Sequence, residues 1–115
     1  ALLDASILVL GPGDTARRGA TRSDPRIVAV DEQMHEVAKE MGVAYWDFRG
    51  AMGGDGSIVD FTKRGLTGAD RIHFGPEGSR LMGDRLLCAL SSSFAKHVDG
   101  HPDAGCPAAD AGTSR

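Results

Sequence analysis

An aspartate and a histidine three residues apart, Asp70 and His73, are the residues of this sequence best suited to catalysis. A histidine that acts as a general base needs a carboxylate on its other ring nitrogen, which fixes the tautomer and stabilises the imidazolium. A turn brings side chains at this spacing together without help from distant residues. The same spacing also occurs where the aspartate only caps a turn and the histidine is a polar loop residue. Spacing alone leaves both interpretations open.

Two other groups of polar residues are weaker candidates. The segment Gly11–Thr15 follows an apolar run, as a phosphate-binding loop would, but it lacks the terminal Gly-Lys-Ser/Thr of such loops. Four potential metal ligands lie near the C-terminus: His97, Asp99, His101 and Cys106. Gly100 and Pro102 interrupt the helical spacing that would place both histidines on one face. We therefore expect no metal and no organic cofactor.

The elements that must position these residues begin with a strand, a helix and a second strand. Ser6–Leu10 is a continuous apolar run, which is typical of a strand in a sheet buried on both faces. A helix is predicted from Ile27 to Met41, capped by Ser23 or Asp24, and a short strand from Val43 to Trp46. The apolar positions of this helix recur every three or four residues and should pack on the sheet: Ile27, Val30, Met34, Val37, Ala38 and Met41. This order predicts two parallel strands.

The connecting segments and the last helix complete this pattern. The polar, basic segment 13–24 is expected to be a solvated loop, and Ser57–Lys63 could form two helical turns within a glycine-rich stretch. Pro76 opens a last helix, because proline is favoured at the first helical position. The predicted buried positions of this helix are Met82, Leu86, Ala89, Leu90 and Phe94. Residues 97–115 are poor in large apolar side chains and are predicted to be a disordered tail.

Composition narrows the classes of function. A chain of 115 residues has room for at most one domain, and its hydrophobic fraction of 41% is ordinary for a globular protein. The net charge of −3 removes the electrostatic basis for nucleic acid or an anionic membrane as the main partner. No apolar run approaches the roughly 20 residues that a membrane-spanning helix needs.

The order of several short motifs resembles the C-terminal half of SGNH (GDSL-type) hydrolases. Within that superfamily the chain looks most like the branch that contains peptidoglycan O-acetylesterases. The resemblance covers roughly residues 4 to 95. The segments that carry it are Ile7–Leu10 with Gly11-Pro12, Val43-Ala44-Tyr45-Trp46-Asp47, Ala51-Met52-Gly53-Gly54, Asp70-Arg71-Ile72-His73-Phe74, Gly75-Pro76-Glu77-Gly78 and Leu81-Met82-Gly83-Asp84.

The resemblance implies a fold and an activity. It implies an α/β fold, a flavodoxin-like three-layer α/β/α sandwich with a parallel sheet, of which residues 1–96 would be the C-terminal part. It implies a serine esterase that acts on an acetyl or short acyl ester, on a carbohydrate or another small molecule. His73 would be the catalytic base and Asp70 its orienting acid. A cell-envelope or secreted location would follow, whereas the oligomeric state stays open.

The family's other catalytic blocks are missing from these 115 residues. They are a serine nucleophile, an oxyanion-hole glycine and an oxyanion-hole asparagine, all upstream of the segments matched here. Ser57, in Gly54-Asp55-Gly56-Ser57, resembles an interrupted Gly-Asp-Ser, but no strand precedes it and a helix N-cap is its expected role. We therefore expect half of an active site, inactive alone. The alternative is a non-catalytic α/β fragment or interaction domain.

Overall fold

Helices and strands alternate in the first half of the chain and helices follow in the second. The computed structural model describes residues 4–99. The elements are β1 (Leu8–Leu10), α1 (Pro25–Glu40), β2 (Ala44–Trp46), α2 (Phe48–Met52), α3 (Ser57–Lys63) and α4 (Pro76–Asp99). The α/β class is thus confirmed, and so are the helices predicted around residues 27–41, 57–63 and from Pro76 onward.

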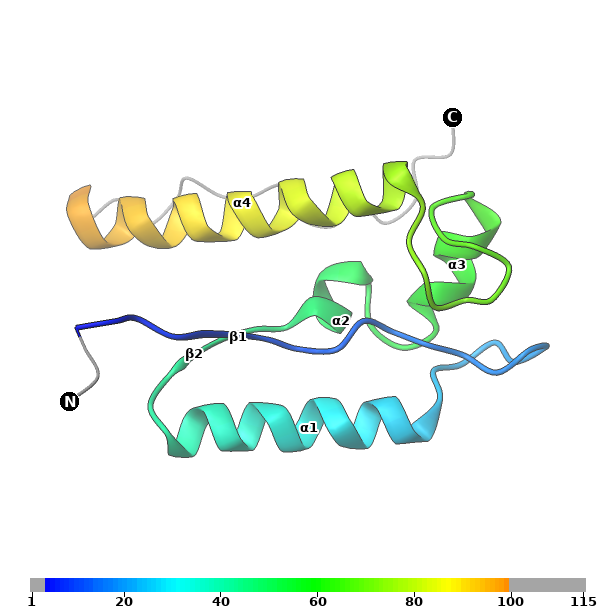
Figure 1. Cartoon of the computed structure of the whole chain (residues 1–115), viewed down its shortest axis with the longest axis horizontal. Coiled ribbons are helices and arrows are strands. Elements are labelled where there is room, and N and C mark those ends of the chain that lie inside the picture. Colours follow the sequence, from blue (N-terminus) through cyan, green and yellow to red (C-terminus); the bar gives the residue numbers. More distant parts are fainter. Residues whose placement is uncertain (1–3, 100–115) are drawn as a thin grey trace.

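The strands β1 and β2 pair in parallel, as the strand–helix–strand order predicts. Leu8 pairs with Ala44 and Leu10 with Trp46, and the ladder continues as the Gly11 amide donates to the Trp46 carbonyl at 2.9 Å. Helices α1 and α4 lie on opposite sides of this strand pair (Figure 1). Within residues 4–99 the sheet has two strands, so the full three-layer sandwich stays a prediction.

Helix α1 begins where its capping residues predict. The Asp24 carboxylate accepts from the Arg26 amide at 2.9 Å, and Pro25 takes the first helical position. The chain then leaves the helix through Gly42, whose φ of 65° suits glycine.

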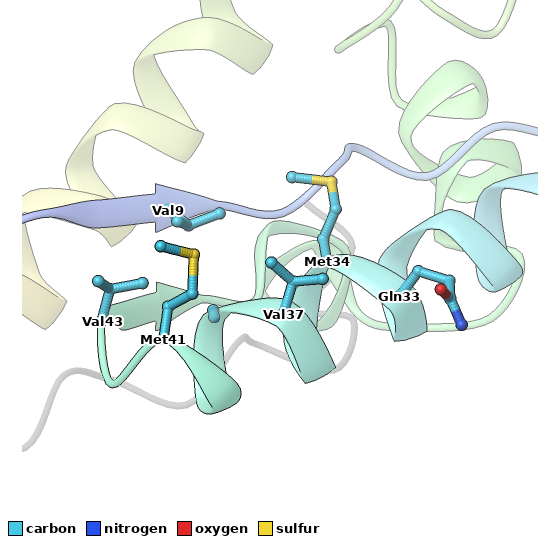
Figure 2. Close-up of a pocket in the computed structure, with 7 residues that line it drawn as sticks. Val9, Gln33, Met34, Val37, Met41 and Val43 are labelled. Atoms are coloured by element: carbon cyan, nitrogen blue, oxygen red, sulfur yellow. The ribbon is translucent and has the colours of Figure 1, made fainter.

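The expected burial of the α1 stripe is confirmed for Ala38, which is 1% exposed, whereas the burial expected for other positions of the stripe and for β1 is wrong. Val30, Val37 and Met41 are 47%, 51% and 71% exposed, and Leu8 and Leu10 of β1 are 38% and 43% exposed. Two strands of three residues cannot cover a helix of sixteen residues, because each strand residue advances only about 3.3 Å. Between α1 and the strands an open apolar gap of about 290 Å³ remains (Figure 2).

The last helix, α4, is also less buried than its sequence predicts. Met82 near its start is buried, whereas Leu90 and Phe94 are 48% and 68% exposed, contrary to the predicted buried stripe. The helix continues to Asp99, so residues 97–99 are helical and not part of a tail. The rest of the predicted tail, residues 100–115, lies outside the described residues. No helix within residues 4–99 is long and apolar enough to cross a membrane.

The hydrophobic core lies where α2, α3 and the first turns of α4 meet. Its buried members are Met52, Ile58, Val59, Phe61 and Met82. Phe74 connects this core to the preceding turn, since its ring lies 5.7 Å from that of Phe48 and 6.1 Å from that of Phe61. The best-packed region of the protein therefore lies directly beside the segment that carries Asp70 and His73.

Candidate functional site

A closed turn holds Asp70 and His73 at the surface. Thr67 and Phe74 form an antiparallel bridge at its base, and the Gly68 amide donates to the His73 carbonyl at 2.9 Å. The Arg71 amide donates back to the Gly68 carbonyl at 3.0 Å. Backbone hydrogen bonds thus close the turn before any side chain contributes.

The two side chains meet as their spacing predicts. His73 Nδ1 lies 2.7 Å from Asp70 Oδ2. The other carboxylate oxygen, Oδ1, accepts from the Ile72 and His73 amides at 3.0 and 3.1 Å. Asp70 therefore caps the turn and also orients the histidine ring. These contacts fit either interpretation of the spacing, and a catalytic role for the pair stays a prediction.

The exposure of this pair leaves one ring nitrogen available. The side chains of His73 and Asp70 are 83% and 47% exposed. When Nδ1 carries the proton that it donates to Asp70, Nε2 has a free lone pair and can accept a proton from another group. This arrangement is the one that a general base requires.

The carboxylate of Asp70 is strongly stabilised in its charged form. The hydrogen bond from His73, with those from the Ile72 and His73 amides, lowers the pKa of Asp70 from 3.8 to about 2. Asp70 is therefore ionised wherever the histidine could act as a base, and it never competes for the transferred proton.

A glycine of α4 brings the helix against this turn. Gly78 is buried, and a Cβ at this position would overlap the Leu66 carbonyl oxygen. The Gly75 amide donates to the same carbonyl at 2.9 Å. The early glycine of the last helix is thus required by close approach of two backbones.

Ser57 is not placed as a nucleophile. It is 8% exposed, and its hydroxyl donates to Asp14 Oδ2 at 3.3 Å; within residues 4–99 it has no hydrogen bond to His73. The expectation that it caps α3 is also wrong, because Gly56 occupies that position with a φ of 73°. The Gly56 amide instead donates to Ser23 Oγ at 2.8 Å.

A buried ionic cluster, which the sequence did not reveal, connects the loop after β1 to α1, β2 and α2. The Asp14 side chain is fully buried; its Oδ2 accepts from the Ile58 amide at 3.0 Å and its Oδ1 lies 3.4 Å from Arg49 Nε. Arg49 Nη1 also lies 3.7 Å from Asp31 Oδ2, and Asp31 accepts from the Tyr45 hydroxyl. Segment 13–24 is therefore not wholly solvated, although its arginines are exposed. An aspartate four residues after the end of an apolar strand is the one signal that could have pointed to this cluster.

This cluster argues against the phosphate-loop interpretation of Gly11–Thr15. Asp14 places a buried negative charge within this segment, and that charge would repel a bound phosphate. No group of three potential metal ligands occurs within the described part of the chain, and His101 and Cys106 lie outside it.

Comparison with known proteins supports the fold. No protein-family profile and no curated protein matches this chain. A solved structure of a peptidoglycan O-acetylesterase superimposes with a TM-score of 0.74 at 23% sequence identity. The superposition covers 82% of this chain but only 27% of that protein, so the chain spans about a quarter of its length. The described residues therefore have an α/β fold similar to part of that esterase.

Proposed function

We propose that this chain supplies the aspartate–histidine half of the active site of an SGNH-type serine esterase. The observation that carries the proposal is the 2.7 Å contact between His73 Nδ1 and Asp70 Oδ2 in an exposed turn with Nε2 free. The fold shared with part of a peptidoglycan O-acetylesterase supports an ester as the substrate. The proposed substrate class is an acetyl or short acyl ester on a carbohydrate.

The proposed reaction uses Nε2 of His73 for every proton transfer. His73 takes the proton from a serine hydroxyl as that oxygen attacks the acyl carbon, and then returns it to the departing alkoxide. In the second half, His73 removes a proton from water as the water oxygen attacks the acyl carbon. It then returns this proton to the serine oxygen as the bond between that oxygen and the acyl carbon breaks, which releases the carboxylic acid. Asp70 stays ionised throughout and stabilises the imidazolium.

The nucleophile and the oxyanion donors must come from strands other than β1 and β2. The open apolar faces of the sheet support this part of the proposal, because parallel sheets are normally covered on both sides. A second gap of about 310 Å³ lies between the strands and α4, lined by Leu8, Trp46, Leu86 and Leu90 among others. Further strands beside β1 and β2 would fill both gaps and bring a serine toward His73.

The alternative function is that of a non-catalytic α/β fragment or interaction domain. Its supporting observation is the same set of exposed apolar side chains, which suits a surface that binds another polypeptide. Both candidates predict a partner segment for the sheet, but only the esterase needs a histidine with a free Nε2.

The deciding experiment reads the coding sequence directly upstream of Ala1 and assays the resulting polypeptide. An in-frame Gly-Asp-Ser block and a Gly-x-Asn block, together with hydrolysis of a chromogenic acetyl ester, would support the esterase. His73→Ala and Asp70→Asn should each abolish or strongly reduce that hydrolysis while the protein stays folded. Absence of both blocks, or full activity of His73→Ala, would favour the interaction domain.

A further inference from the structure

The second residue of the Asp70–His73 turn has an uncommon backbone conformation. Arg71 has a φ of 56° and is the one non-glycine residue with a positive φ among residues 4–99. The left-handed region is unfavourable for a residue with a Cβ, and it persists only where surrounding contacts hold it. The side chain of Arg71 makes such contacts.

The guanidinium of Arg71 ties the turn to a loop that is distant in the sequence. Its Nη1 donates to the carbonyl of Arg17 at 3.1 Å and to that of Ala20 at 2.9 Å. These two carbonyls belong to one tight turn, in which the Ala20 amide donates to the Arg17 carbonyl at 2.9 Å. One nitrogen of Arg71 therefore donates hydrogen bonds to both ends of that turn.

The loop that contains Arg17 and Ala20 is itself hydrogen-bonded to other parts of the fold. The Asp24 amide donates to the Thr15 carbonyl at 2.7 Å. Arg22 Nε and the Ser23 amide donate to the Asp55 carboxylate at 2.9 and 3.0 Å. The contacts of Arg71 thus connect the exposed turn to a rigid support and not to a free loop.

We propose that Arg71 is a positioning residue, which holds the Asp70–His73 turn in the geometry that orients the imidazole. Because the His73 side chain is 83% exposed and that of Asp70 about half exposed, packing does little to orient them, and the backbone of the turn must do so. Asp70 Oδ1 accepts from the Ile72 and His73 amides, so its carboxylate faces Nδ1 only while Arg71 stays left-handed. The part of this inference that concerns catalysis rests on the proposed function, whereas the positioning does not.

The test removes the guanidinium while sparing the backbone. Arg71→Asn is the main variant, because asparagine tolerates a positive φ better than other non-glycine residues but cannot reach Arg17 or Ala20. Arg71→Lys is the conservative variant, which keeps a positive charge and a long donor. Arg18→Ala is the matched control. It removes an equal charge from the turn between Arg17 and Ala20, but it leaves the hydrogen bonds of Arg71 to the backbone of that turn in place.

Nuclear magnetic resonance gives two readouts that do not require esterase activity. The ring ¹⁵N shifts of His73 report which nitrogen carries the proton, and a ¹³C titration reports the pKa of Asp70. In Arg71→Asn we expect Nδ1 protonation to give way to a mixture of tautomers, and the Asp70 pKa to rise from about 2 toward 3.8. Arg71→Lys should recover most of the wild-type behaviour, and Arg18→Ala all of it.

Each outcome of these measurements either supports or overturns the positioning role of Arg71. A folded Arg71→Asn variant with the wild-type tautomer and an Asp70 pKa near 2 would overturn the inference, even if its unfolding temperature falls. If Arg71→Asn does not fold, Arg71→Ala replaces it with the same expected readouts, since alanine also lacks the guanidinium and does not favour a positive φ. Failure of the complete polypeptide to hydrolyse esters would overturn the proposed function and leave these spectra unchanged.

Discussion

The backbone of Gly78 in α4 lies directly against the carbonyl oxygen of Leu66, with no room for a Cβ between them. This contact joins the last helix to the strand-like segment that begins the Asp70–His73 turn. The site therefore depends on a helix–loop distance that only glycine permits.

Gly78→Ala should destabilise the protein by about 1–3 kcal/mol, because the added methyl group forces α4 away from Leu66. Urea denaturation measures the change. The matched control is Gly83→Ala in the same helix, where a Cβ would meet no atom within 4 Å. This control should be neutral or more stable by up to about 1 kcal/mol, since alanine favours helix. Equal effects of the two substitutions would contradict the contact.

Asp14→Ala should destabilise the protein by about 3–5 kcal/mol. It leaves the Ile58 amide unpaired and deprives the largely buried Arg49 of one counter-charge. Asp60→Ala provides the comparison, because the Asp60 side chain is 66% exposed and pairs with Arg64 at the surface. Its cost should stay below about 1 kcal/mol. A small loss of stability in Asp14→Ala would show that the buried cluster contributes little.

The pairing of Asp70 with His73 predicts a defined dependence on pH. The folded pKa of Asp70 is lowered from 3.8 to about 2, so its contribution to stability is fully present above pH 3.8 and is lost as the pH falls through 2. A ¹³C titration of the carboxyl group in His73→Phe should show the Asp70 pKa moving back toward 3.8. A midpoint that stays near 2 in this variant would mean that the backbone amides alone lower it.

The single tyrosine of the chain offers a second titration. Burial, followed by the hydrogen bond to Asp31, raises the pKa of Tyr45 well above 10. Its contribution to stability is therefore present below pH 10 and is lost only as the pH rises through the raised value. Ultraviolet titration of the phenolate measures this directly, and Asp31→Asn should move the midpoint downward. Ionisation near pH 10 in the wild-type protein would refute the buried pairing.

The chain of 115 residues should not hydrolyse a chromogenic acetyl ester. Ser57 is buried, and its hydroxyl donates its hydrogen bond to Asp14 and not to His73. The assay compares the wild-type chain with Ser57→Ala. Turnover that Ser57→Ala abolishes would make Ser57 the nucleophile, and turnover that survives it would contradict the half-site proposal.

Local patterns were sufficient for both strands, for the helices α1, α3 and α4 and for the contact of the candidate pair, but they did not predict α2. The capping by Asp24, the opening of α4 at Pro76 and the contact of Asp70 with His73 each involve residues within four positions of one another. Such short-range interactions are determined by neighbouring residues, so the sequence by itself predicts them. The parallel pairing of β1 and β2 follows equally from the helix between them.

Long-range contacts were decided only by the tertiary structure. The apolar stripe of α1 correctly predicts a helix, but its exposure depends on how many strands lie beside it, which periodicity does not encode. Asp14 reaches Ile58 across forty-four positions and Arg71 reaches Arg17 across fifty-four, and neither pair forms a local motif. Burial of a charge and support of a left-handed turn both require partners that the chain brings together only on folding.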